Sequence, residues 1–158
     1  MLFRITGLSP KPFRHLFGLS EAELLAKGVE RHVADVTPGY PDRVELRDAL
    51  PGESVLLLNY THQPAPSPYR SSHAIFVLEG AWARYDGVDQ IPEALRCRLI
   101  SLRGFSREGH LRDADVADGH CLEALIERMF ANHSVSYIHA HFAKPGCYAA
   151  RIDRVGSA

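Results

Sequence analysis

Apolar residues recur along most of the chain in patterns that predict short β-strands. Phe3 and Ile5 alternate with polar residues, which is the period of a half-buried strand. Two runs, 55–60 and 74–78, are continuously apolar, as is typical of strands buried on both faces near the centre of a sheet. Further strands are predicted over 33–36, 43–47, 95–102, 111–117, 135–142 and 147–153.

Two segments carry the signals of helices. Ser20 and Glu23 have the spacing of a capping box, and Gly28 supplies a terminator, so a helix of about two turns is expected between them. In the second segment Asp118 is the expected cap, and Cys121 is expected to be a packed core thiol. The apolar residues that follow at helical spacing are Leu122, Leu125, Ile126, Met129 and Phe130.

The order of these elements indicates the fold class. Few helices and many short strands, without strict alternation of the two, predict an α+β fold with a largely antiparallel sheet and two main helices. Neither an internal repeat nor a linker interrupts the pattern, so residues 1–158 are expected to form a single globular domain.

Composition and charge exclude several classes of protein. The 158 residues carry 18 basic and 19 acidic side chains, so no basic surface for nucleic acid is expected. A mean hydropathy of -0.15, without a long apolar run, argues against a membrane span. The first residues do not resemble a signal peptide, so a cytoplasmic protein is expected. Its oligomeric state is not predicted.

The predicted C-terminal hairpin carries the best polar constellation in the sequence. A turn of odd length that contains Gly146 would pair Ile138 with Ile152 and Phe142 with Tyr148, and this register keeps charged residues off the apolar face. The other face then carries Tyr137, His139, His141 and Arg151.

Three interpretations of that polar face are open. It is an ordinary exposed strand face, a metal-free site in which a histidine is the general base and Arg151 holds an anion, or a metal site. A metal would need a third ligand from His62, His73 or Glu79. Because none of these stands at a diagnostic spacing, we expect no bound metal and no cofactor.

A loop, 62–73, joins the two apolar runs, and alternate prolines at 64, 66 and 68 stiffen it. We expect its end to fold over the C-terminal hairpin and to form a pocket for a small molecule, most simply an anionic metabolite. The residues expected to line this pocket are Tyr60, Tyr69, Arg70, His73, His139, His141 and Arg151. The alternative is a protein-interaction module that presents loop 62–73 to a partner. Common hydrolase, zinc-protease and nucleotide-loop motifs are missing, which removes those three interpretations, and the sequence leaves open whether the protein is an enzyme.

A second group of basic residues lies upstream of the second predicted helix. Five arginines fall within a short stretch, and they are expected either to form an exposed strand face among acidic neighbours or to gather an anion. They are Arg96, Arg98, Arg103, Arg107 and Arg112.

Several segments together resemble a bacterial family of unknown function, the one catalogued as domain of unknown function number 1203. They are Phe3–Leu8, Leu56–Tyr60, Ser67–Arg70, Ile75–Val77, Ser101–Arg103, and Tyr137–Ala140 with the later Pro145–Cys147. The resemblance extends over nearly the whole chain and implies no known activity.

Overall fold

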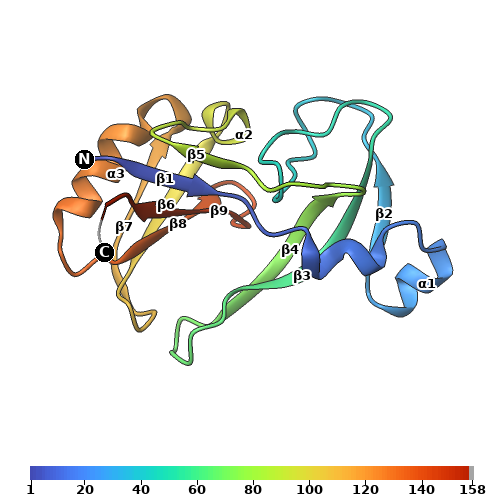
Figure 1. Ribbon diagram of the computed structural model, residues 1–158, viewed down its shortest axis with the longest axis horizontal. Coiled ribbons are helices and arrows are strands. Elements are labelled where there is room, and N and C mark those ends of the chain that lie inside the picture. Colours follow the sequence, from blue (N-terminus) through green and yellow to red (C-terminus); the bar gives the residue numbers. More distant parts are fainter. Residues whose placement is uncertain (157–158) are drawn as a thin grey trace.

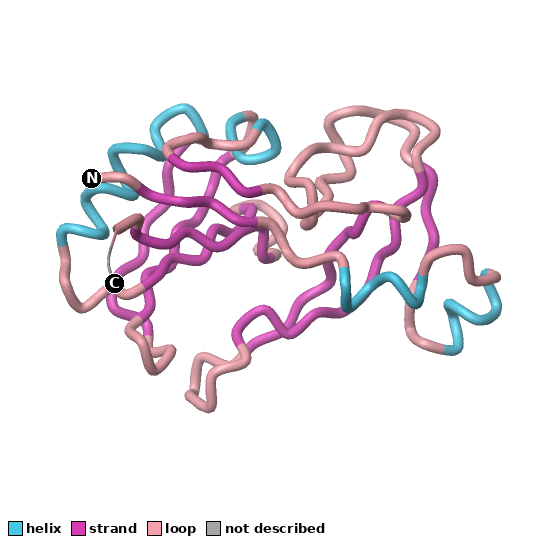
Figure 2. The backbone as a smooth tube through the Cα atoms, viewed as in Figure 1, coloured by secondary structure: helices cyan, strands magenta, loops and turns pink. Residues whose placement is uncertain are grey.

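Two antiparallel sheets form the framework of the protein (Figure 1). The computed structural model describes residues 1–156, which contain nine strands. The larger sheet has six strands and the smaller sheet has three. Figure 2 shows the two sheets side by side, joined by loops along one edge. This architecture confirms the predicted α+β class in one compact domain, with two sheets where one was expected.

Most of the predicted strands are present, and the short strand over 86–88 was not predicted. The larger sheet consists, in spatial order, of β5 (Asp86–Val88), β1 (Phe3–Thr6), β9 (Tyr148–Arg154), β8 (Tyr137–Phe142), β6 (Leu99–Phe105) and β7 (Leu111–Asp118). The smaller sheet consists of β2 (Glu30–Val33), β3 (Ser54–Gln63) and β4 (Ser71–Leu78). Strands β3 and β4 extend beyond their apolar runs into segment 62–73, so only 64–70 remains as a loop.

The helices are short, and the longest covers one face of the larger sheet. The helical segments are η1 (Lys11–Leu16), α1 (Glu21–Ala26), α2 (Glu93–Arg96), η2 (Gly119–Cys121) and α3 (Leu122–Ala131). The predicted capping box of α1 is present, because the Ser20 side chain accepts from the Glu23 N–H and Glu23 accepts from Ser20. Ile126 and Met129 of α3 are fully buried in one cluster with Leu102, Ile138 and Ile152 of the sheet. The opposite face of the same strands is therefore left for the polar residues.

Three local predictions were wrong. Segment 43–47 is irregular, because Leu46 takes a positive φ of 54° and Arg43 is buried among backbone carbonyls. Leu95 belongs to α2, which begins after Pro92, and the following strand starts only at Leu99. Cys121 is exposed, because it ends the 3₁₀ turn η2 before the apolar face of α3 begins.

Two smaller differences concern strands of the smaller sheet. The strand predicted over 33–36 lies earlier, at Glu30–Val33. Strand β4 lies at the edge of the sheet, and several of its residues are exposed, so it is not a central strand. None of the helices in residues 1–156 is long and apolar enough to cross a membrane.

Candidate functional site

The register of the hairpin β8–β9 places the polar face as predicted, with one correction. Ile138 lies opposite Ile152, and His139 lies opposite Arg151. A bulge between Ala140 and His141 then shifts the pairing, so Tyr148 lies opposite His141 and not opposite Phe142. The bulge turns the Tyr148 ring toward the histidines, while Cys147 and Ala149 join the apolar cluster beneath.

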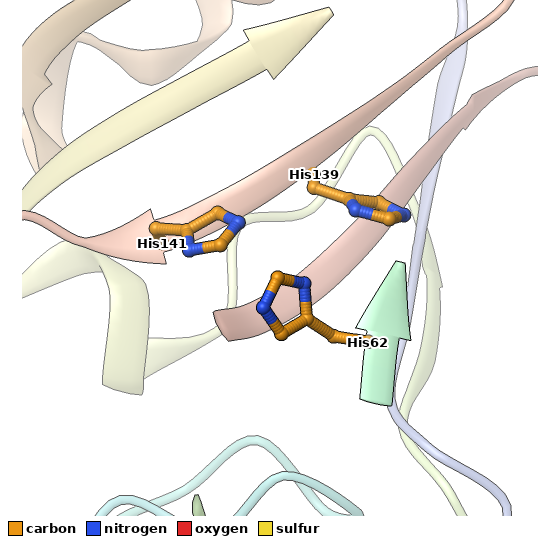
Figure 3. A group of neighbouring side chains, drawn as sticks. All are labelled: His62, His139 and His141. Carbon is orange, nitrogen blue, oxygen red and sulfur yellow. The ribbon is translucent and has the colours of Figure 1, made fainter. Parts of the chain in front are cut away.

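A third histidine comes from the smaller sheet. His62, near the end of β3, points toward His139 and His141 on β8 (Figure 3). One ring nitrogen from each residue lies within 4.8 Å of the other two. His139 and His141 are 3% and 1% exposed, and His62 is 9% exposed, so this histidine cluster is almost closed off from water.

The hydrogen bonding of the histidine cluster is incomplete. His141 Nδ1 lies 3.0 Å from the Gly146 carbonyl, and because a carbonyl only accepts, this nitrogen carries the proton. The buried Nδ1 atoms of His62 and His139 have no hydrogen-bond partner in residues 1–156. Each such nitrogen has lost its contact with water without a replacement, which is costly and uncommon in folded proteins.

Burial keeps all three rings neutral. It lowers the pKa of His62 to about 4, and it lowers the pKa values of His139 and His141 to about 3 each. The positive charge of Arg103 adds to the effect on all three rings. At neutral pH each imidazole therefore has one nitrogen with a free lone pair.

Aromatic rings fix the positions of these imidazoles. The Tyr148 ring stacks on His62 with centroids 5.4 Å apart. Phe105 and Tyr137 lie against His139, each with its centroid 5.2 Å away. His62 and His139 are thus held by packing rather than by hydrogen bonds from Nδ1, which leaves these two nitrogens available.

Arg103 is the unpaired cation beside the histidine cluster. It lies opposite His139 in the pairing of β6 with β8, so the two side chains share one sheet face. The guanidinium is half-buried, and burial lowers its pKa. The ion pairs of residues 1–156 include Arg96, Arg98 and Arg151 but leave Arg103 without a carboxylate.

Arg151, which the sequence suggested as an anion ligand, is already paired. Its Nε and Nη2 donate to both oxygens of Asp153 at 2.8–3.0 Å, and its guanidinium lies 4.1 Å from the Tyr137 ring centroid. Arg151 shares the polar face with His139 as predicted, but its guanidinium is already in an ion pair with Asp153.

Tyr60 and His73 belong to β3 and β4 of the smaller sheet, not to the strands that form the polar face. They are opposite each other in the pairing of β3 with β4. The Tyr60 ring packs on Phe13, and burial raises the Tyr60 pKa. His73 lines a separate cavity of about 720 Å³, and Arg43 and Phe142 form part of the same wall.

Tyr69 and Arg70 lie away from the hairpin. The Ser67 hydroxyl donates to the Gly109 carbonyl at 2.9 Å, which ties loop 64–70 to the β6–β7 turn, at the lower edge of Figure 1. The Tyr69 ring packs on Phe105 and the Arg70 guanidinium donates to the Pro64 carbonyl. Gln63, the last residue of β3, contacts the hairpin instead, because its amide donates to the Tyr137 hydroxyl at 3.0 Å.

A cleft of about 710 Å³ opens beside the histidine cluster. His62 and His139 form part of its wall, together with Arg107, Arg151, Asp153 and Arg154. Its size suits a small molecule. The cleft combines neutral imidazoles with three guanidinium groups and one carboxylate, so the net charge of its lining residues is positive.

Residues 39–154 match the family described as Protein of unknown function (DUF1203). The chain belongs to this family. The DUF1203 match includes His62, Arg103, His139 and His141, so the histidine cluster lies wholly within the family region. No curated protein and no solved structure matches the chain.

Proposed function

We propose that the protein binds a small anionic molecule, with a carboxylate or phosphate group, in the cleft beside the histidine cluster. The observation that carries this proposal is the half-buried guanidinium of Arg103, which has no acidic partner in residues 1–156. Arg103 does not itself line the cleft, but it lies opposite His139, which does. A guanidinium that is partly removed from water loses solvation, and a forked pair of hydrogen bonds to an anion restores it.

The surroundings of Arg103 support the same ligand chemistry. Arg107 and Arg151 stand on the wall of the cleft, and Arg107 is exposed. His139 and His62 are neutral at pH 7, so they offer an anion hydrogen bonds without a counter-charge of their own. The ligand would be a cytoplasmic metabolite of a bacterium, in keeping with the compartment and the family that the sequence favours.

The test is a binding screen on the metal-free protein, in buffer that contains a chelator. The panel consists of inorganic phosphate, sugar phosphates, and di- and tricarboxylates, measured by thermal shift and then by calorimetry. Arg103→Gln should weaken the best hit at least about tenfold, since one charge-assisted pair contributes roughly 1.5–3 kcal/mol. Arg112→Gln, which changes an exposed arginine on the neighbouring strand, should leave the affinity unchanged.

A panel in which no anion stabilises the protein would contradict the proposal, and so would unchanged affinity in Arg103→Gln. Either result would favour the alternative of a protein-interaction module. That alternative rests on the exposed Pro64, Pro66 and Pro68, which an aromatic groove of a partner would recognise.

A further inference from the structure

We infer that His62, His139 and His141 together bind one divalent transition-metal ion, and that Zn²⁺ is the ion their chemistry suits best. This inference goes beyond the binding of an anion, and it replaces the expectation from the sequence that no metal is bound. It rests on the histidine cluster alone and stands whether or not Arg103 holds a ligand.

The first support for the inference is that the three histidine rings converge on one point. The three rings come from both sheets, yet one nitrogen of each points into the same small space (Figure 3). Two of these residues belong to one strand at i and i+2, so their side chains project from the same face. His62 approaches that face from β3 and supplies the third corner.

The second support is the pair of unpartnered nitrogens. Nδ1 of His62 and Nδ1 of His139 are buried and have no hydrogen-bond acceptor or donor in the described residues. A buried polar atom without a partner needs an explanation, and a single metal ion would satisfy both atoms at once. We therefore assign these two nitrogens as metal ligands.

His141 contributes the third ligand through its other nitrogen. Its Nδ1–H donates to the Gly146 carbonyl, which fixes the tautomer and leaves the Nε2 lone pair free. A hydrogen bond of this kind, from the nitrogen that does not bind the metal, is the usual support of a metal-ligating histidine. The same carbonyl belongs to the turn that closes hairpin β8–β9, so the ring is anchored to a rigid element.

The donor set selects the metal. Three neutral imidazoles suit zinc and its neighbours in the first transition row, whereas Mg²⁺ and Ca²⁺ require oxygen ligands. Zn–N bonds of ~2.0–2.1 Å in a tetrahedral site put the donors about 3.4 Å apart. The donors now lie up to 4.8 Å apart, so the rings would draw together when the ion binds.

Three protein ligands leave a fourth position open, as in catalytic rather than structural zinc sites. The rings of His62 and His139 also form part of the cleft wall, so a small molecule bound in the cleft would lie next to the residues that hold the ion. The charge of Arg103 opposes a metal cation, and because no carboxylate belongs to the histidine cluster, an anionic fourth ligand would offset both positive charges.

The experiment is a titration of the full-length, chelator-treated protein with Co²⁺ and then with Zn²⁺. One equivalent of Co²⁺ should produce the visible absorption of a four- or five-coordinate nitrogen site, and Zn²⁺ should abolish it. His139→Asn and His62→Asn should each weaken binding more than about 100-fold, since loss of a supporting residue alone costs 10–100-fold. His15→Asn, at an exposed histidine outside the histidine cluster, is the matched control.

Circular dichroism of each variant establishes that it is folded, and the wild-type titration decides the question even where a variant is not. Weak or absent Co²⁺ binding by the wild type at 100 µM, or tight binding retained in His62→Asn, would overturn the inference. A crystal structure at saturating Zn²⁺ that holds only a water between the rings would overturn it too. Anion binding is measured separately, in buffer that contains a chelator. One proposal can therefore fail while the other holds.

Discussion

The His62 imidazole stacks on the Tyr148 ring, with centroids 5.4 Å apart and planes only 10° from parallel. His62 belongs to the smaller sheet and Tyr148 to the larger one, so this contact joins the two sheets directly beside the histidine cluster. Tyr148 reaches this position only because the bulge in the hairpin places it opposite His141. The bulge thus determines which ring closes the site.

Removing the Tyr148 ring should destabilise the protein and loosen His62. Tyr148 is 4% exposed, and truncation of a buried aromatic ring to Ala costs about 3–5 kcal/mol. We expect Tyr148→Ala to lower the free energy of unfolding by this amount, measured by urea denaturation. Tyr148→Phe keeps the stacked ring and should stay within about 1 kcal/mol of wild type. Equal losses in both variants would show that the hydroxyl, rather than the ring, carries the contact.

Replacing Arg103 should leave stability unchanged or raise it. The Arg103 guanidinium is half-buried and has no acidic partner in residues 1–156. Its loss of solvation in the folded state is therefore not offset by an ion pair. We expect the free energy of unfolding of Arg103→Gln to be equal to wild type or higher by up to about 1 kcal/mol. Urea denaturation in ligand-free buffer checks this. A loss of more than about 2 kcal/mol would mean that the side chain has a structural role through its aliphatic stem.

Much of the larger sheet was predictable because its signals are local. Ile138 and Ile152 had to face the core together, and that requirement alone determined the register that sets His139 opposite Arg151. The capping box at Ser20 was equally local. By contrast, the irregular segment at Leu46 also contains the buried Arg43, two of whose partners, Tyr148 and Cys147, are distant in the sequence.

The site was only partly predictable because its residues belong to two sheets. His62 was one of three possible third ligands, and nothing in its spacing from His139 distinguished it from His73 or Glu79. Glu79 instead pairs with Arg31 at 2.7 Å. Arg103 belongs to an arginine-rich stretch in which Arg96 and Arg98 find carboxylates, and the packing of the sheets alone leaves Arg103 unpaired. Neither outcome follows from the order of residues along a strand.

Stability should fall in acid through the ion pair of Glu53 with Arg47. The Arg47 guanidinium donates to both Glu53 oxygens at 2.8 and 2.9 Å and lowers the pKa of Glu53 to about 2. A folded-state pKa below the unfolded value stabilises the protein above about pH 4.5, and this stabilisation is lost as the pH falls toward 2.

Because both side chains are partly exposed, we expect Glu53→Gln to lower the free energy of unfolding by only about 0.5–1 kcal/mol at pH 7. The difference from wild type should shrink between pH 4.5 and pH 2. Urea denaturation across this range measures it, with the exposed Glu127→Gln as the control. A difference that stays constant with pH would exclude the ion pair as its source.

Substitution of Arg43 should lower the free energy of unfolding more than substitution at most other positions, although Arg43 lies outside the histidine cluster. It is 2% exposed and donates to the Tyr148 carbonyl at 2.8 Å, to the Cys147 sulfur at 2.9 Å and to the Pro41 carbonyl. These bonds attach segment 41–43 to the first residues of β9, next to the bulge. Arg43 therefore links the segment between β2 and β3 of the smaller sheet to the strand that carries Tyr148.

Arg43→Met keeps much of the side-chain volume but leaves two buried carbonyls without donors, at about 1–3 kcal/mol each. We expect the free energy of unfolding to fall by about 2–5 kcal/mol, and Arg43→Lys to recover little, because one ammonium does not reproduce the planar fork. Cys147→Ala removes only the weak sulfur acceptor and should cost less than about 2 kcal/mol. Urea denaturation of the three variants decides between the contacts, since a loss in Cys147→Ala as large as that in Arg43→Met would assign the stabilisation to the thiol rather than to the two carbonyls.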